Sequence, residues 1–214
     1  MLRALVTGVP GALGTAVARA LITAGYVTSV IVRKEEEAPL APDDAQVYVA
    51  DLLDLAGLRT LASHTGPWNA ICACAGGFGM GDLDAVTDED VERMIDINFR
   101  TAQNTLSAFG PHLTGAAVLV GSQASAGSAH MAAYAASKAA VASLVRSADL
   151  EWRGRGRRVV GIQPDTIDTP ANRAAMPNAD FDRWAKPDEI ANVMIFLCSD
   201  AGRLVHGTMI PVGR

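Results

Sequence analysis

Apolar residues follow two alternating patterns along this chain. Short and nearly continuous apolar runs, which are typical of buried strands, alternate with longer segments in which apolar residues recur every three or four positions, as on one face of a helix. The runs predict strands over residues 2–6, 26–32, 46–50, 68–74, 116–121, 158–163 and 208–212. The periodic segments predict a first helix that ends at Gly25, and helices over residues 52–63, 87–109, 131–152 and 186–197.

This alternation of strands and helices predicts the fold class. Strands separated by helices at this spacing form an α/β fold with a doubly wound parallel sheet of Rossmann type, in three layers. No internal repeat or linker interrupts the pattern, and we expect one domain over residues 1–214. Residues 171–185 are expected to be irregular or to form a short helical segment. Thr87 and Asp90 predict a capping box at the start of helix 87–109.

Composition narrows the class of protein. Half of the 214 residues are hydrophobic and only 19% are charged, as in a well-packed globular chain. The net charge of −5 argues against a nucleic-acid surface. No apolar run approaches the ~20 residues of a membrane span, and the run at the N-terminus is too short for a signal peptide. The three cysteines fit neither a disulfide framework nor a zinc site, so we expect free thiols, no metal and a cytoplasmic location.

A glycine-rich turn follows the first strand. The segment Thr7-Gly8-Val9-Pro10-Gly11-Ala12-Leu13-Gly14 leads directly into the first helix. Strand, glycine turn and helix together place backbone N–H groups and a helix N-terminus against a phosphate. Gly8 would permit the tight turn, while Gly11 and Gly14 would leave room for a pyrophosphate. A plain strand-to-helix connection is the alternative interpretation.

The end of the second strand carries two cations. In many dinucleotide sites an acidic residue at this position binds the ribose 2′-hydroxyl, but here the strand ends in Arg33 and Lys34. A cation there can accommodate a 2′-phosphate, which favours NADP(H) over NAD(H). The alternative is a solvated run of charges, because Glu35, Glu36 and Glu37 follow at once.

Three later strand ends also carry residues suited to a ligand. Asp51 and Leu52 follow the third strand, and Asp51 could accept from an adenine amino group or cap the next helix. Ala75-Gly76-Gly77 follows the fourth strand, where glycine allows close backbone approach. Pro164 to Thr169 follows the sixth. Ligands of parallel sheets bind at the carboxyl ends of the strands, so these segments are expected to form one site.

The helix over residues 131–152 carries candidate acid–base chemistry. Tyr134 and Lys138 are four residues apart and therefore share one face of that helix. A nearby ammonium lowers the pKa of a phenol, which suits a proton donor near neutral pH. A partly exposed helix with a snorkelling lysine is the alternative. Asn98 lies among apolar residues, where an amide must be hydrogen-bonded, and either a packing role or a functional one is open.

Taken together, these residues resemble the short-chain dehydrogenase/reductase family along the whole chain. The matching pieces are the Thr7–Gly14 loop, Asp51, Ala75-Gly76, Asn98, Gly121-Ser122, Tyr134-x-x-x-Lys138, Pro164 through Thr169, and Gly207-Thr208. The resemblance implies that Tyr134 donates a proton, that Lys138 lowers its pKa and holds the nicotinamide ribose, and that Asn98 anchors a proton-relay water. The implied cofactor site comprises Thr7, Gly8, Gly11, Leu13 and Gly14 at the pyrophosphate, Asp51 and Leu52 at the adenine, Ile167 and Thr169 at the carboxamide, and Ala75, Gly76 and Pro164 nearby.

The chain departs from the family pattern in three places. Ala12 stands where the middle glycine of the loop is usual, with Gly11 displaced by one position. Ile31 stands where one branch of the family, the dihydropteridine reductases, has an acidic residue on the second strand that favours NADH. The family's catalytic serine usually lies thirteen residues before the tyrosine, but that position is Gly121, and Ser122 lies twelve before. We expect Ser122 to take the role through a one-residue loop deletion, with Ser125 and Ser128 as further candidates.

Within the family, the tail resembles the dihydropteridine reductase branch. Its residues Asp168 to Arg173, Met176-Pro177, Ala179 to Phe181 and Trp184 follow that branch's pattern. The segment between Pro170 and Lys186 is short for a family lid, which suggests an open site for a flat or bulky substrate. The resemblance also implies a homodimer or homotetramer that forms through helices 87–109 and 131–152.

These observations predict an enzyme that acts on a small molecule. We expect an NADPH-dependent reductase that transfers hydride to a ketone or a β-keto thioester while Tyr134 donates the proton. Reduction of a quinonoid dihydropterin is one alternative. A non-catalytic NADP-binding sensor is another, although retention of both Tyr134 and Lys138 argues against it.

Overall fold

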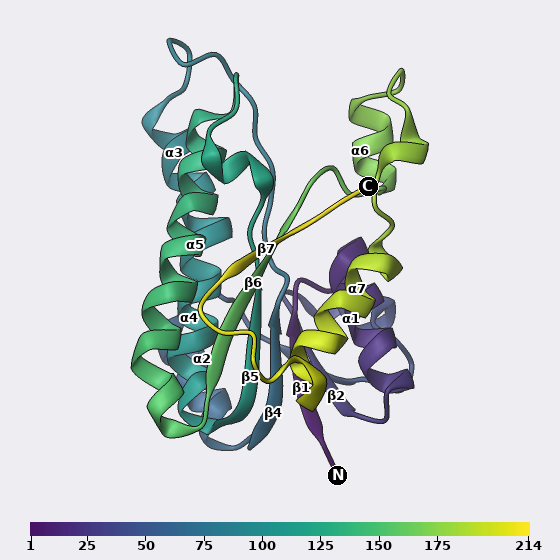
Figure 1. Cartoon of the computed structure of the whole chain (residues 1–214), viewed down its shortest axis with the longest axis vertical. Coiled ribbons are helices and arrows are strands. Elements are labelled where there is room, and N and C mark those ends of the chain that lie inside the picture. The colour runs from purple at the N-terminus through teal and green to yellow at the C-terminus, as the bar shows by residue number, and fades with distance from the viewer.

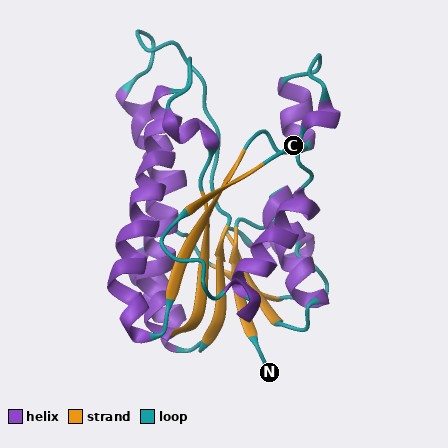
Figure 2. Ribbon diagram, in the orientation of Figure 1, coloured by secondary structure: helices purple, strands orange, loops and turns teal.

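Seven parallel strands form the centre of the molecule, in the order β3-β2-β1-β4-β5-β6-β7 (Figures 1 and 2). The computed structural model describes residues 1–214. The strands are β1 (Arg3–Thr7), β2 (Val27–Val32), β3 (Gln46–Val49), β4 (Trp68–Ala73), β5 (Leu113–Val120), β6 (Arg158–Pro164) and β7 (Met209–Val212). The α/β, Rossmann-type prediction is confirmed, because continuous apolar runs occupy the strands that are covered on both faces.

Helices cover both faces of the sheet. They are α1 (Ala12–Thr23), α2 (Leu55–Ser63), α3 (Asp88–Met94), α4 (Thr101–Phe109), α5 (Ala132–Trp152), α6 (Pro170–Ala175) and α7 (Pro187–Cys198). One core lies between the sheet and α1 with α7, and a second lies between the sheet and α2, α4 and α5. Figure 1 shows these two helical layers on opposite sides of the strands. None of the helices is both long and apolar enough to cross a membrane.

The strand order reverses beside β1. This strand pairs with β2 on one side and with β4 on the other. The chain therefore builds the sheet outward from β1 first toward β3 and then, from β4 on, toward β7. The loops that follow β1 and β4 therefore lie next to each other at the carboxyl edge of the sheet. This point is the usual ligand site of a doubly wound sheet.

The long helix expected over residues 87–109 is correct in extent but not in form. Its predicted capping box is present, since Thr87 Oγ1 accepts from the Asp90 backbone N–H at 3.2 Å and the Asp90 carboxylate accepts from the Thr87 N–H at 3.4 Å. However, α3 and α4 are separated by a π-helical turn over Ile95–Arg100. The apolar periodicity continues across this turn, so the sequence pattern cannot reveal it.

Other boundaries differ by a few residues. β5 starts at Leu113 rather than at residue 116, and α2 starts at Leu55 rather than at residue 52. The segment expected to be irregular or helical contains the short helix α6 and a 3-10 turn over Phe181–Arg183. A further 3-10 turn, Glu35–Leu40, follows the charged end of β2.

Candidate active site

The glycine loop after β1 packs tightly against its own neighbours. Gly8 has a φ of +83°, and a Cβ atom there would lie 2.5 Å from the carbonyl carbon of Cys74, the residue that follows β4. A Cβ at Gly14 would lie 2.4 Å from the Gly8 carbonyl oxygen. Both positions therefore require glycine, whatever the loop binds. Thr7 Oγ1 accepts from the Ala75 N–H at 3.4 Å, which joins this loop to the one after β4.

The first turn of α1 has free backbone donors. Gly11 occupies the N-cap position of this helix and offers no side-chain acceptor to the N–H groups that follow. Leu13 and Gly14 are buried in this first turn, and Gly14 packs against the Gly8 backbone. An uncapped helix N-terminus beside a close-packed glycine loop matches what a dinucleotide pyrophosphate needs. The residues present fit such a cofactor.

Tyr134 and Lys138 lie on one turn of α5, as their spacing predicts. Lys138 is only 5% exposed, and its Nζ donates to the carbonyl oxygen of Val120, the last residue of β5, at 3.1 Å. The Nζ lies 5.9 Å from the centre of the Tyr134 ring. The interpretation of Lys138 as a snorkelling surface lysine is therefore wrong, because its ammonium is held inside the protein.

Burial determines the acid–base state of this pair. It raises the pKa of Tyr134 above the ordinary value, while the nearby Ser122 hydroxyl works in the opposite direction. It lowers the pKa of Lys138 to about 8. The expected lowering of the Tyr134 pKa by Lys138 is absent from this structure. The physical reason is that the ammonium is directed at Val120, whereas the phenol loses water contacts.

The structure distinguishes the three candidate serines. Ser122 is 8% exposed, accepts from the Ala124 N–H at 3.2 Å and is the one of the three that lowers the pKa of Tyr134. Ser125 instead accepts from Gln163 Nε2 at 2.8 Å. Ser128 lies exposed in the loop that precedes α5. A spacing of twelve residues therefore still brings Ser122 to the tyrosine.

Asn98 connects three parts of the candidate site. It is 1% exposed within the π-helical turn, where its Oδ1 accepts from the Gly77 N–H at 3.1 Å and its Nδ2 donates to Ser137 Oγ at 3.1 Å. The amide thus fixes the loop after β4 against α5. A Cβ atom at Gly76 would lie 2.8 Å from Asn98 Oδ1 and 3.2 Å from Lys138 Nζ, so only glycine fits between them.

Of the predicted adenine and 2′-phosphate residues, Arg33, Lys34 and Asp51 are exposed and Leu52 is half-buried. Arg33 and Lys34 form no ion pair with the three glutamates that follow, although the Glu37 carboxylate accepts from the Arg33 backbone N–H at 2.9 Å. Asp51 accepts from the Leu53 N–H at 2.9 Å but does not cap α2, because Asp54 takes that position and accepts from the Gly57 N–H. The carboxylate of Asp51 and both cations therefore remain available to a ligand.

The loop after β6 is held by its own polar contacts. Thr169 caps α6 by accepting from the Asn172 N–H at 3.1 Å, and the Ile167 carbonyl accepts from Asn172 Nδ2 at 2.8 Å. Asp168 and Arg173 form a two-bond ion pair of 2.5 and 2.8 Å, which lowers the pKa of Asp168. Pro164 ends β6 at the carboxyl edge of the sheet, so this predicted segment lies at the same edge as the glycine loop.

Two residues of the site escaped the sequence analysis. Phe78 packs edge-on against Tyr134, with ring centroids 5.1 Å apart. Ser137 accepts from Asn98 and itself donates to the Tyr134 carbonyl oxygen at 2.7 Å. Ser137 could have been noticed because it lies between Tyr134 and Lys138 on the same helix, whereas nothing in the sequence around Phe78 indicates its contact.

Comparison with known proteins decides the family. A family model described as short chain dehydrogenase matches residues 3–180. The chain belongs to the short-chain dehydrogenase/reductase family. Within this family it is 33% identical to galactitol 2-dehydrogenase of Rhizobium johnstonii, over 98% of this chain and 93% of that protein. It is 30% identical to the 3-oxoacyl-(acyl-carrier-protein) reductase MabA of Mycobacterium tuberculosis, over 97% and 90% of the two chains.

Solved structures show the same fold. An NADPH-bound short chain oxidoreductase from Pseudomonas aeruginosa PAO1, described as containing an atypical catalytic center, superposes with a TM-score of 0.88 and 26% identity, over 99% of this chain and 95% of that one. A blue fluorescent protein from a metagenomic library, in complex with NADPH, superposes with a TM-score of 0.87 and 26% identity, over 99% and 96%. This short-chain dehydrogenase/reductase is accordingly an oxidoreductase of a family whose members bind nicotinamide dinucleotides.

Proposed function

We propose that this protein is an NAD(P)H-dependent carbonyl reductase in which Tyr134 donates the proton. The observation that carries the proposal is the buried Lys138 one helical turn from Tyr134, together with Ser122, whose hydroxyl acts on the Tyr134 phenol. Two hydroxyls that face one point can hold a carbonyl oxygen between them, and one can pass it a proton. The bound dinucleotide supplies the hydride.

The acid–base state of the site suits reduction. Because burial raises the pKa of Tyr134, its phenol is protonated at neutral pH and can donate its proton to the product oxygen. Ser122 Oγ donates a hydrogen bond to the same oxygen and orients it. Phe78 covers one side of the Tyr134 ring and limits the access of water. Asn98 holds the Gly77 loop and α5 in position around these groups.

We infer that NADPH is preferred to NADH. Arg33 and Lys34 are exposed at the end of β2 and have no ion-pair partner, so both can face a 2′-phosphate. Solved structures of the family with bound NADPH support a dinucleotide of this kind. In the proposed complex, Asp51 and Leu52 face the adenine of the cofactor, while Ile167 and Thr169 face its carboxamide.

A ketone or β-keto thioester is the substrate class that we favour. Ser122 is placed to polarise a carbonyl, and MabA, a relative, is named as a 3-oxoacyl reductase. A quinonoid dihydropterin is the second candidate, favoured by the tail residues from Asp168 to Trp184 that follow the dihydropteridine reductase pattern. A non-catalytic NADP sensor is the third. It requires cofactor binding without turnover.

The test is oxidation of NADPH and of NADH, side by side, with a ketone and β-keto thioester panel and with quinonoid dihydropterin. We expect turnover of a ketone with NADPH and a loss of at least about 100-fold in Tyr134→Phe, with cofactor binding retained. Tyr26→Phe is the matched control, because Tyr26 precedes β2 at the opposite edge of the sheet. Full turnover in Tyr134→Phe would remove the mechanism. Turnover of the pterin with NADH would support the second candidate, and binding without any turnover would support the sensor.

We further propose a homodimer or homotetramer that forms through α3, α4 and α5. The small residues along the first turns of α5, such as Ala132, Ala136 and Ala139, permit close contact between helices, and these three are exposed. A monomer in light scattering at micromolar concentration would contradict this proposal.

We also propose a cytoplasmic location, with which the three free cysteines are consistent.

A further inference from the structure

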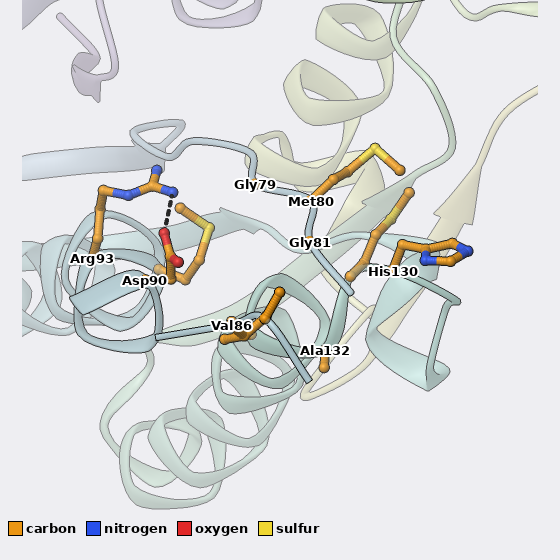
Figure 3. A pocket seen from close by; sticks show the side chains of 12 residues that line it. Gly79, Met80, Gly81, Val86, Asp90, Arg93, His130 and Ala132 are labelled. Carbon is orange, nitrogen blue, oxygen red and sulfur yellow. Dashed lines mark hydrogen bonds and ion pairs between the residues drawn. The ribbon is translucent and has the colours of Figure 1, made fainter. Parts of the chain in front are cut away.

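A cavity of about 170 Å³ lies between the loop after β4, the helix α3 and the start of α5 (Figure 3). The adjoining residues of α5 include the proposed proton donor, Tyr134. Met94 is buried in its wall, at 1% exposure, and Val86, Met131 and Ala133 complete an apolar lining. Met80 is exposed at its edge. We refer to this space as the Met94 cavity.

The Met94 cavity adjoins Tyr134 along two chain segments. Ala133, which lines it, immediately precedes Tyr134 in α5. Gly79, which also lines it, immediately follows Phe78, whose ring packs against the Tyr134 ring at 5.1 Å. A ketone carries two substituents on its carbonyl carbon, which we call its arms. If the carbonyl lies at Tyr134, one of these arms therefore lies next to the cavity.

The charged groups around the cavity are already paired with each other. Arg93 lies 3.3 Å from Asp90, and His130 Nδ1 lies 2.5 Å from Asp82 Oδ1. All four side chains are about half exposed or more, so these pairs form a solvated rim. Figure 3 shows the Arg93–Asp90 pair and His130 on opposite sides of the cavity. No unpaired charge inside it would attract a phosphate or a carboxylate.

We propose that the Met94 cavity binds an unbranched aliphatic arm of the substrate, an inference that rests on the proposed reductase function. Three of its lining residues are methionines, whose flexible side chains adapt to an alkyl chain. A polyhydroxylated arm would lose its water contacts against the apolar wall, where only Asp90, Arg93 and His130 at the rim offer hydrogen bonds. The cavity thus assigns the protein to linear alkyl ketones or 3-oxoacyl compounds, not to polyols of the kind named for the galactitol dehydrogenase relative.

Gly79 provides a way to fill the cavity. Its φ is not positive, and a Cβ atom there would lie 3.1 Å from Met94 Sδ and 3.4 Å from Met94 Cε. Gly79→Val therefore takes up space that an alkyl chain would use, and the flexible Met94 side chain can adjust to it. Gly154→Val is the matched control, because a Cβ at Gly154 meets nothing within 4 Å.

The experiment uses butan-2-one, hexan-2-one and octan-2-one with wild type and both variants. We measure kcat/KM with NADPH, and we measure dissociation constants by ligand-observed NMR on the protein saturated with NADP⁺, where no reduction can occur. In wild type, kcat/KM and affinity should each rise about fourfold per added methylene until the cavity is full. Gly79→Val should lower the octan-2-one to butan-2-one ratio by about tenfold or more, while Gly154→Val keeps it.

The two readouts separate this inference from the reductase proposal. Chain-length dependence in binding that Gly79→Val removes would support the Met94 cavity even if no ketone were reduced, in which case only the reductase proposal would fail. A wild-type series without chain-length dependence would overturn the cavity assignment, even with rapid turnover. The same conclusion would follow from an equal dependence in wild type and Gly79→Val.

Discussion

Lys138 Nζ donates a hydrogen bond to the carbonyl oxygen of Val120 at 3.1 Å, so the ammonium of α5 is fixed to the last residue of β5. This contact places a buried cation at the carboxyl edge of the central strands. It also explains why Lys138 does not lower the pKa of Tyr134 in this structure, since the ammonium is directed at the sheet.

The first prediction concerns stability and pH at Lys138. Burial lowers the pKa of this lysine to about 8, whereas an unfolded lysine titrates near 10.4. Between these values the unfolded chain binds the extra proton, so folding becomes more favourable as pH rises. From pH 8 to pH 10, wild type should gain about 1–3 kcal/mol in the free energy of unfolding relative to Lys138→Met. Urea denaturation at both pH values measures this, and parallel curves for the two proteins would contradict it.

The second prediction separates the serines. Ser122→Ala removes the hydroxyl that acts on the Tyr134 phenol, and kcat should fall by about 100-fold or more, as for a lost donor to a reacting oxygen. Because Ser122 lowers the pKa of Tyr134, that pKa should rise further in the variant. Ser125→Ala is the control, since its hydroxyl accepts from Gln163 instead. Steady-state kinetics with any ketone that the enzyme reduces measures kcat in both variants. An equal loss of kcat in Ser122→Ala and Ser125→Ala would argue against the role of Ser122.

The third prediction concerns Asn98. Replacement by alanine leaves the Gly77 N–H without its acceptor and Ser137 Oγ without its donor, in a buried position. An unsatisfied buried donor costs about 1–3 kcal/mol, and the free energy of unfolding should fall by that amount. Asn192→Ala, at an exposed position of α7, should change it by less than about 0.5 kcal/mol. Chemical denaturation compares the two, and an Asn98→Ala variant as stable as wild type would refute the packing role.

The fourth prediction concerns the cofactor. Loss of a charge-assisted contact to a 2′-phosphate should weaken NADPH binding by about tenfold or more in Arg33→Ala or Lys34→Ala, with little effect on NADH. Arg203→Ala, an exposed arginine beyond α7, serves as the control. Fluorescence titration of both cofactors measures the ratio. If the binding of NADPH and of NADH weakens equally, the two cations act on both cofactors through general electrostatics and do not contact a 2′-phosphate.

Much of this fold follows from local patterns in the sequence. Apolar runs with flanking turns locate all seven strands, and the central strands are apolar throughout because helices cover both of their faces. The glycine turn after β1 and the Thr87–Asp90 capping box are equally local, since each depends on the backbone of a few consecutive residues. The helical face shared by Tyr134 and Lys138 follows from helix geometry alone.

The tertiary structure decided what depends on distant neighbours. Whether Ser122, Ser125 or Ser128 meets Tyr134 depends on how the loop after β5 folds over α5, and whether Asp51 or Asp54 caps α2 depends on where that helix starts. The direction of the pKa shift at Tyr134 depends on burial by residues such as Phe78, which lies 56 positions away along the chain. Spacing in a sequence sets which residues can share an element, but desolvation and hydrogen-bond partners arise only when separate elements pack together.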